Sequence, residues 1–196
     1  MDRQHGQGTI KYENGSVFNG SFSKGEMVFG ELKLKDGTKY LGDFQDGIFH
    51  GEGDITWADG SSYVGPFFKG KRHGSDGEYE YKNGDRYVGD WEHGEQHGHG
   101  ILVSKKGHRY EGAWKHGKMH GKGTLKYARG EVYEGGFAHG RREGRGRLSD
   151  SQGGYYDGEW VKDQRHGKGC IRAMEFVEGK VQDSCAFYTY GGCSIS

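Results

Sequence analysis

Histidine and cysteine are the residues of this chain best suited to metal chemistry, because both ligate metal ions. The sequence contains eleven histidines and three cysteines. Most of the histidines recur at two positions of a unit about 23 residues long. If each unit folds as a pair of strands, equivalent positions lie ~10 Å apart, too far to share one ion. We therefore expect these histidines to pack in loops. They are His50, His73, His97, His120 and His166 at one position and His93, His116 and His139 at the other.

A second candidate metal site lies near the C-terminus, where His166, Cys170, Cys185 and Cys193 could form a zinc site. Their spacings match no standard zinc pattern, so the sequence predicts no metal site and no cofactor. The odd and sparse cysteine count is not that of a disulfide scaffold. It favours a reducing compartment.

Catalysis is not indicated by the remaining polar residues. The stretch His120-Gly121-Lys122-Gly123 lacks the strand-to-helix context of a phosphate loop. No Ser/His/Asp, Cys/His or paired-carboxylate set breaks the periodicity. Catalytic residues should be singular, whereas nearly every polar residue here has a counterpart one repeat away. The sequence therefore predicts that the chain is not an enzyme.

The elements that position these residues follow from the repeat itself. An aromatic residue followed two positions later by glycine recurs at spacings of 22, 23, 24, 23, 23 and 23. The pattern Tyr-x-Gly-x-Trp/Phe has the two-residue period of a strand. Turn dipeptides such as Asn14-Gly15 and Asp59-Gly60 stand at a fixed place in each unit, and they are strong hairpin signals. The aromatic residues are Phe18, Tyr40, Tyr63, Tyr87, Tyr110, Tyr133 and Tyr156.

Each repeat is therefore expected to be a strand, a loop, a second strand and a tight turn. Glycines alternate with aromatics on one face, which leaves room for a ring to lie over a glycine of a neighbouring strand. The other face is charged. We predict an all-β fold: an elongated, single-layer antiparallel sheet of tandem β-hairpin repeats, twisted and groove-forming.

The pattern Tyr-x-Gly-x-Trp/Phe followed by Gly-x-x-His-Gly-x-Gly closely resembles the MORN repeat (membrane occupation and recognition nexus). Phe29 in the first repeat, an extra residue in the third and Glu143 in the sixth depart from the pattern. The expected organisation is an N-terminal half-repeat at 1–17, seven repeats within 18–178 and a C-terminal tail at 179–196. The repeats are 18–39, 40–62, 63–86, 87–109, 110–132, 133–155 and 156–178.

The resemblance implies a stand-alone, non-catalytic scaffold or adaptor, cytoplasmic and associated with the cytoskeleton or with ciliary axonemes. A regulatory subunit of a lipid kinase or a methyltransferase is a less favoured alternative. A one-layer sheet is expected to leave ring edges exposed along a groove, and extended apolar surfaces usually meet partners. We therefore predict that the aromatic-glycine face binds a helix or an extended segment of a partner protein. The predicted groove residues are Tyr40, Phe44, Tyr63, Phe67, Tyr87, Trp91, Tyr110, Trp114, Tyr133, Phe137, Tyr156 and Trp160.

An alternative is a membrane-associated adaptor that docks on acidic phospholipids. Each Lys or Arg near an anionic leaflet contributes ~1 kcal/mol, so a cluster of basic loops could hold the chain there. The candidate lipid-binding residues of repeats 5 to 7 are Lys115, Lys118, Arg141, Arg142, Arg145, Arg147, Arg165 and Lys168.

The charge distribution bears on further partners. The formal net charge is zero, which does not favour nucleic acid. Residues 1–98 hold 11 Lys+Arg and 17 Asp+Glu, and residues 99–196 hold 17 and 11, so the halves have net charges of −6 and +6. Opposite charges attract, and the half-repeat at Gly6–Tyr12 leaves an unpaired edge. We therefore also predict self-association, as an antiparallel homodimer rather than as head-to-tail chains.

Overall fold

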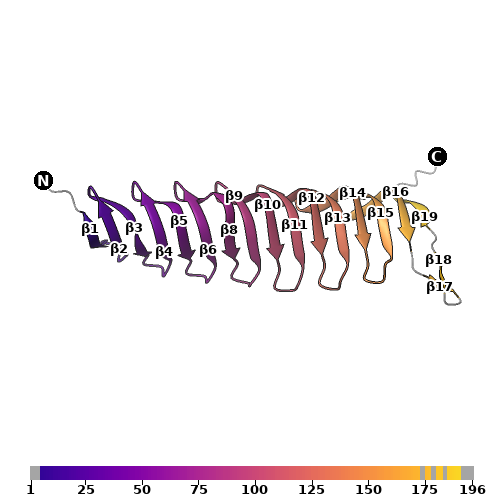
Figure 1. The fold of residues 1–196 in the computed structure, drawn as a ribbon, viewed down its shortest axis with the longest axis horizontal. Helices are drawn as coiled ribbons and strands as arrows, with labels where there is room; N and C mark the ends of the chain where they lie inside the picture. The colour runs from indigo at the N-terminus through magenta and orange to yellow at the C-terminus, as the bar shows by residue number, and fades with distance from the viewer. Residues whose placement is uncertain (1–4, 173–174, 178–179, 183–184, 191–196) are drawn as a thin grey trace. The chain divides into compact units, whose positions relative to one another are not determined.

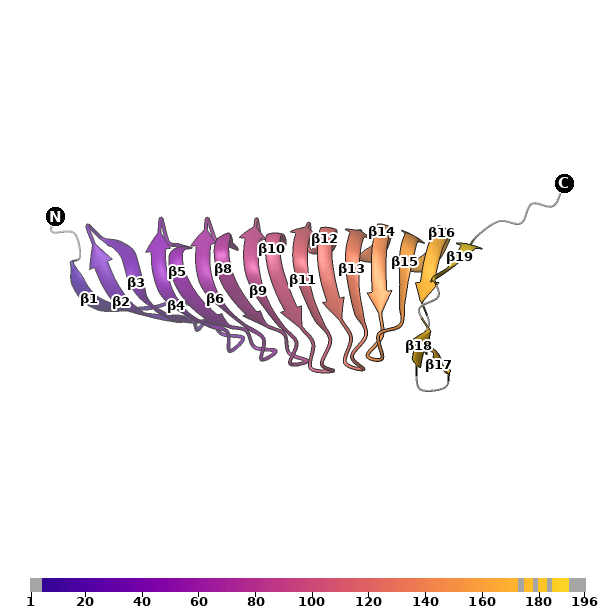
Figure 2. The same ribbon diagram turned by 45° about the vertical axis from the view of Figure 1, so that its right-hand side comes forward.

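The computed structural model describes residues 5–172, 175–177, 180–182 and 185–190. The chain divides into two compact units, residues 1–98 and 99–196. Within each unit most strands pair antiparallel with their neighbours in the sequence (Figures 1 and 2). The exceptions are Ser62–Phe68, which pairs with both Lys71–Arg72 and Gly74–Glu80, and Gln164–Arg172, which pairs with Cys185–Tyr190. The described residues contain no helix, and so none that could cross a membrane. The predicted all-β sheet of tandem hairpins is confirmed.

The first unit contains β1 to β9, and β10 runs across the boundary between the units. These strands are β1 (Gly6–Lys11), β2 (Val17–Ser23), β3 (Glu26–Lys33), β4 (Lys39–Gln45), β5 (Ile48–Thr56), β6 (Ser62–Phe68), β7 (Lys71–Arg72), β8 (Gly74–Glu80), β9 (Arg86–Glu92) and β10 (Glu95–Val103).

The second unit continues the same alternation and adds a short separate hairpin, β17–β18. Its strands are β11 (Arg109–Lys115), β12 (Lys118–Lys126), β13 (Val132–Ala138), β14 (Arg141–Ser149), β15 (Tyr155–Val161), β16 (Gln164–Arg172), β17 (Glu175–Val177), β18 (Lys180–Gln182) and β19 (Cys185–Tyr190).

Two kinds of turn connect the strands. In the turns predicted from Asn-Gly and Asp-Gly, the side chain of the Asn or Asp accepts a hydrogen bond from the backbone two residues on, as Asn14 does from Ser16 N at 2.9 Å. The other turns place a non-glycine residue and then a glycine at positive φ, as at His116 (50°) and Gly117 (70°). Histidine tolerates this left-handed region better than most residues. His93, His116 and His139 therefore act as turn residues, in line with the prediction that they pack in loops. For four others the loop prediction is wrong, because they lie in strands β5, β10, β12 and β16: His50, His97, His120 and His166.

The core is a row of aromatic rings that cover one another. The first aromatic residue of each repeat is 0–2% exposed and the second is 2–6% exposed. The ring of Tyr110 meets Trp114 and Phe137 edge to face, with centroids 5.4 and 5.0 Å apart. Its hydroxyl donates to the carbonyl of Ala113 at 2.8 Å. Trp114 Nε1 donates to the carbonyl of Gly100 at 3.1 Å, so both polar groups of this ring pair are satisfied.

The glycines beside the rings are required by space. A Cβ atom added at Gly123 would lie 2.6 Å from the Oη atom of Tyr110, and one added at Gly112 would lie 2.5 Å from the Cα atom of Gly123. Real Cβ atoms do not approach other atoms so closely. The prediction that rings lie over glycines is thus confirmed, and it explains why glycine occurs inside strands where it otherwise weakens them.

A further side chain in each repeat covers the rings from the second strand. Phe49 stacks on Tyr40 with centroids 3.8 Å apart. Arg72 lies 4.2 Å over Trp91, and Arg142 lies 4.1 Å over Trp160. These residues oppose the second aromatic residue across a register shift in the hairpin, as Arg142 opposes Phe137. They explain how a sheet without helices buries its aromatic face.

Candidate functional site

The twelve aromatic residues predicted to line a binding groove are all buried, with exposed fractions of 0–6%. Sequence analysis predicted exposed ring edges, and this part of the prediction is wrong. The rings are covered by one another and by side chains such as Arg142 from the second strand of each hairpin. A role of these residues in partner binding stays a prediction. Because these rings are buried, such a role would be indirect, through the strands that they hold in place.

The eight basic residues predicted to bind lipid do not form one patch. Arg142 is held in the core, since its guanidinium donates to Asp163 and its side chain is 17% exposed. Arg165 lies over the ring of Tyr156 at 4.9 Å. Of the others, Lys115, Lys118 and Arg141 lie beside the turns, Arg145 and Arg147 line a groove on the charged face, and Lys168 lines an adjoining hollow together with Arg145. Lipid docking by these residues stays a prediction.

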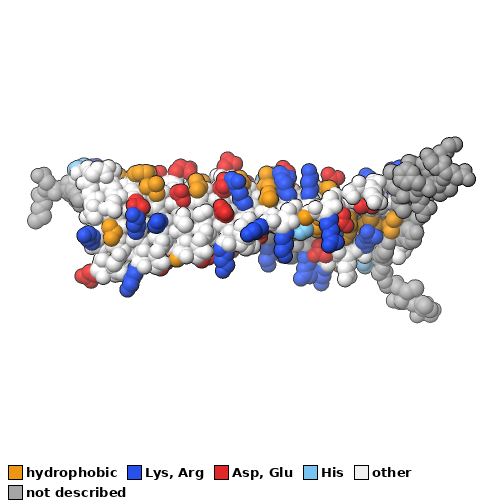
Figure 3. Space-filling view, turned by 90° about the horizontal axis from the view of Figure 1, so that it is seen from below, with side chains coloured by type: hydrophobic (Ala, Val, Ile, Leu, Met, Phe, Trp, Pro, Cys, Tyr) orange, Lys and Arg blue, Asp and Glu red, His pale blue; other side chains and the backbone are white. Residues whose placement is uncertain are grey.

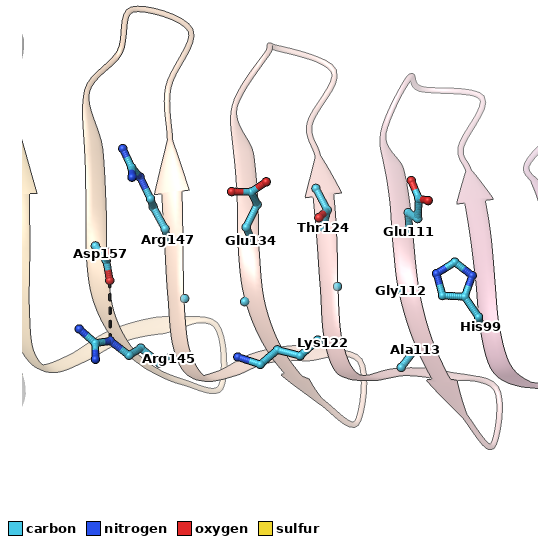
Figure 4. A pocket seen from close by; sticks show the side chains of 13 residues that line it. His99, Glu111, Gly112, Ala113, Lys122, Thr124, Glu134, Arg145, Arg147 and Asp157 are labelled. Atoms are coloured by element: carbon cyan, nitrogen blue, oxygen red, sulfur yellow. Dashed lines mark ion pairs between the residues drawn. The ribbon is translucent and has the colours of Figure 1, made fainter.

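A groove with a volume of about 760 Å³ lies on the charged face of the second unit. Its walls come from β10 to β15, so it crosses several strands (Figure 4). In the space-filling view, Lys and Arg side chains gather on the face of this unit that Figure 3 shows. The lining residues are His99, Glu111, Gly112, Ala113, Lys122, Gly123, Thr124, Glu134, Gly135, Arg145, Gly146, Arg147 and Asp157.

A row of glycines crosses the sheet beneath this groove, and it defines how far along its strand each lining side chain lies, which we call its level. The row runs straight across the sheet, because each glycine is the register partner of the next: Gly112, Gly123, Gly135, Gly146, Gly158 and Gly169. In antiparallel strands, the residue before a glycine on one strand lies level with the residue after the glycine on the next. Side chains on either side of the glycines therefore form two rows, and the register shifts within the hairpins β11–β12, β13–β14 and β15–β16 all fall on one side of the glycines.

The first row, which we call the basic row, comprises Lys122 on β12, Arg145 on β14 and Lys168 on β16. They are separated by 23 residues, and His99 occupies the same repeat position. Ala113 and Gly136 lie at the intervening positions on both sides of Lys122, so the groove is hollow there. Glu159 is the register partner of Arg145 and lines an adjoining hollow with Lys168, although its partner on β16 is His166.

The second row, which we call the acidic row, comprises Glu111, Glu134 and Asp157, with Thr124 and Arg147 between them. Figure 4 shows Lys122 and Arg145 at one level of the strands and Thr124, Glu134 and Arg147 at the next. Within the groove, the basic row contributes Lys122 and Arg145 on one side, and the acidic row contributes three carboxylates and Arg147 on the other.

Two of the three carboxylates of the acidic row have a cationic partner, whereas Glu134 has none among the described residues. Glu111 accepts a hydrogen bond from Arg109 at 2.7 Å, and this contact lowers the pKa of its carboxyl. Asp157 lies 3.9 Å from the Nε atom of Arg145, whose side chain is 83% exposed. Within the part of the chain that the structure describes, Lys122 and Lys168 make no ion pair or side-chain hydrogen bond, and both are exposed. The basic row therefore offers free cations to a partner.

Sequence analysis identified Arg145 and Lys168 but missed Lys122 as part of the same row. A signal was present, because each cation is the middle residue of a Gly-x-Gly motif. The corresponding residues of the first unit are Gln7, Phe29, Glu52 and Asp76, so the cations are specific to the second unit. The first unit instead exposes apolar side chains on its charged face, with Leu41 49% and Val64 52% exposed.

Cys170 forms a disulfide bond, which sequence analysis did not predict. A cysteine in a disulfide has no thiolate to offer, so Cys170 does not fit the zinc candidate in this state. The other cysteines of that candidate, Cys185 and Cys193, lie outside the residues whose side chains the structure describes. Among the described residues, no group of three or more His, Cys, Asp or Glu side chains is placed to hold a metal ion.

Comparison with known proteins gives the following. No curated protein matches the chain. Among solved structures, the SAS-4 (dCPAP) TCP domain of Drosophila melanogaster, solved with a proline-rich motif of Ana2 (dSTIL), is similar at 10% identity and a TM-score of 0.49. That match covers 94% of this chain and 90% of the other. The G-box domain of the microcephaly protein CPAP has 14% identity, a TM-score of 0.39 and coverages of 79% and 93%. A mutant TCP10 domain of Danio rerio CPAP has 14% identity, a TM-score of 0.34 and coverages of 91% and 99%.

The family comparison agrees with the repeat seen in the sequence. The MORN repeat model matches seven segments, which together cover most of the chain: 1–17, 40–62, 63–86, 87–109, 110–132, 133–155 and 156–172. The same segments supply the ring core and the glycine row described above. This chain belongs to the MORN repeat family.

Proposed function

We propose that the chain is a non-catalytic scaffold that binds a segment of a partner protein in the charged groove of its second unit. The aromatic residues form the core, and the charged face is left to interact with other molecules. We further propose, from the family resemblance, that the assembly it joins is cytoskeletal or ciliary.

One observation supports this proposal above the others. The groove crosses strands β10 to β15 and contains exposed charges that the described part of the chain leaves unpaired, among them Lys122 and Glu134. Such charges are hydrated in the free protein, and a partner with complementary charges can pair with them at modest desolvation cost. The rigid ring core beneath the groove holds them at fixed spacing, so the charge pattern is preorganised.

The groove also lacks the features of a catalytic site. It is an open trough in which residue types recur with the repeat, as Glu111 and Glu134 do at 23-residue spacing. A repeated surface suits the recognition of an extended chain, because the same contact can be made several times along it.

The test is site-specific photocrosslinking in cells. A photoreactive amino acid is placed at Ala113, inside the groove, and at Lys118, which lies outside it on the next strand. The proposal expects discrete protein adducts from position 113 but not from position 118. It also expects Lys122→Glu to abolish the adducts of position 113. Adducts of equal yield from both positions, or none from the groove, would show that the groove is not a protein-binding site.

A further inference from the structure

Resting on the proposed function, a narrower statement about the partner follows from the basic row. We propose that the partner segment is an extended acidic peptide with a carboxylate at every third residue, lying across the strands with its carboxylates on Lys122, Arg145 and Lys168. The chemistry of the partner is set by the cations, and its periodicity is set by their spacing.

The spacing follows from the register of the sheet. Lys122, Arg145 and Lys168 lie on β12, β14 and β16, at the same offset from the glycine row. Neighbouring strands are ~4.8 Å apart, so cations on every second strand are ~9.6 Å apart. A polyproline II chain rises ~3.1 Å per residue, which places every third side chain on one face at ~9.3 Å. The two periods agree to within ~0.3 Å per repeat.

Other backbone conformations fit less well. A helical partner presents residues seven apart on one face at ~10.5 Å, and the mismatch of ~0.9 Å grows with each repeat. A β-strand presents every second residue on one face at ~6.6 Å, which is too short for one repeat. The cations therefore favour an extended segment of the polyproline II type over a helix or a strand.

The sign of the partner's charge follows from which row is free. Lys122 and Lys168 have no ion pair in the described part of the chain, and Arg145 has only the 3.9 Å contact with Asp157. In the acidic row, Glu111 is bonded to Arg109, and Glu134 is the one carboxylate without a partner among the described residues, against two such cations in the basic row. Residues 99–196 also have an excess of Lys and Arg, 17 against 11 Asp and Glu. This excess draws acidic segments toward the groove.

One carboxylate works against the proposed partner. Glu159 is level with Arg145 across β14 and β15, and it lines the adjoining hollow together with Lys168. It would repel an acidic side chain seated between these two cations. Glu159→Gln removes the negative charge with little change of shape. The proposal therefore predicts an increase in affinity on this substitution, a direction that general loss of structure cannot produce.

The experiment measures binding of fluorescent synthetic peptides to the full chain by anisotropy at low salt. One peptide of about twelve residues has glutamate at every third position in a proline- and alanine-rich sequence that favours polyproline II. A second has the same composition with its glutamates contiguous, and a third is helical with glutamates seven apart. The period-three peptide can form several surface ion pairs with the basic row that the peptide with contiguous glutamates cannot form at the same time. It should therefore bind about five- to tenfold more tightly than that peptide.

Matched variants identify the residues responsible. Lys122→Glu and Arg145→Glu should each abolish the preference for the period-three peptide, and Glu159→Gln should strengthen its binding. Lys118→Glu makes the same charge change on β12 outside the groove, and it should retain the preference. Circular dichroism and thermal midpoints equal to those of the wild type show that each variant is folded.

Equal affinity for the three peptides, or tighter binding of the helical one, would overturn the inference. So would binding to phosphatidylserine vesicles that depends on Lys122 while the peptides do not bind, because the partner would then be a membrane. Sedimentation that changes with Lys122→Glu and not with peptide would overturn it in favour of a second copy of the chain. If position 113 still forms protein adducts while the peptides show no preference, the proposed function stands and only the partner chemistry fails.

Discussion

Replacing Gly123 by alanine should destabilise the second unit through contact with a single ring. The added Cβ atom would lie 2.6 Å from Cε2 and from Oη of Tyr110. Ordinary contacts between such atoms are ~3.5–4.0 Å, so the ring must retreat by about 1 Å. It has no free path, since Trp114 and Phe137 enclose it at 5.4 and 5.0 Å and Oη is bonded to Ala113 O at 2.8 Å.

The magnitude follows from three contributions. Overpacking a closed core costs ~1–3 kcal/mol, and loss of the Tyr110 hydrogen bond costs ~1 kcal/mol. Alanine also lowers the conformational entropy of the unfolded chain relative to glycine, which stabilises the folded state by ~0.4–1 kcal/mol. We expect Gly123→Ala to lower the free energy of unfolding by about 2–3 kcal/mol, measured by urea denaturation with tryptophan fluorescence.

A double-mutant cycle isolates the cause. Tyr110→Leu removes the ring atoms that the new Cβ atom would meet, so Gly123→Ala should become nearly neutral in that background. Gly112→Ala is the matched control, because its Cβ atom would meet backbone as well as Tyr110, with Gly123 Cα at 2.5 Å, Lys122 O at 2.6 Å and Tyr110 Oη at 2.7 Å. It should remain destabilising whether or not the ring is present. If Tyr110→Leu rescued both glycine variants equally, or neither, the account of rings lying over glycines would be refuted.

Burial raises the pKa of Tyr110 and of Tyr133 to about 12. The folded state therefore binds these phenol protons more tightly than the unfolded state. The contribution of the two tyrosines to stability is fully present below pH ~10 and is lost as the pH rises toward ~12. Urea denaturation at alkaline pH should show this decline, and a free energy of unfolding that stays constant across this window would contradict it. Arg142→Ala should lower the free energy of unfolding in urea by about 2 kcal/mol, because it removes the hydrogen bonds to Asp163 and the side chain that covers the Trp160 ring. The control Arg141→Ala, at an exposed position, should change stability by less than ~0.5 kcal/mol. Equal effects of the two substitutions would show that Arg142 is not part of the core. If the basic residues near the turns dock on acidic lipid, flotation with phosphatidylserine vesicles should be lost above ~0.5 M salt and should weaken with Lys115→Glu; flotation with neutral vesicles to the same extent would exclude this docking.

The hairpins, the turns and the ring-over-glycine packing could all be predicted from the sequence. Each depends on contacts between residues at fixed spacing, such as Tyr110 with Gly112 one strand period away. The cover over the rings could not be predicted, because Arg142 reaches its place only through a register shift between Gly135 and Phe137. Without that shift, Arg142 is indistinguishable from its exposed neighbour Arg141.

The charged groove was missed for a different reason. Basic residues were grouped by their number in repeats 5 to 7, whereas the structure groups them by their level relative to the glycine row. Lys122 and Lys118 belong to the same strand, yet only Lys122 lines the groove. The disulfide of Cys170 lay outside the reach of the repeat pattern, since cysteine occurs too rarely in this chain to take part in the periodicity.

In the proposed arrangement, stability depends on one set of alternate residues in each strand and partner binding on the other set, and substitutions at adjacent positions can test this separation. Gly123 belongs to the side on which Tyr110 lies, and Lys122 belongs to the charged side. Because the ring core is closed, Lys122→Glu should change peptide affinity without moving the urea midpoint. Gly123→Ala should move the midpoint but leave the affinity of the remaining folded protein within about twofold, since the register of the glycine row is kept. A variant at Gly123 that abolished binding while the protein stayed fully folded would mean that the rings themselves contact the partner, as the sequence alone had suggested.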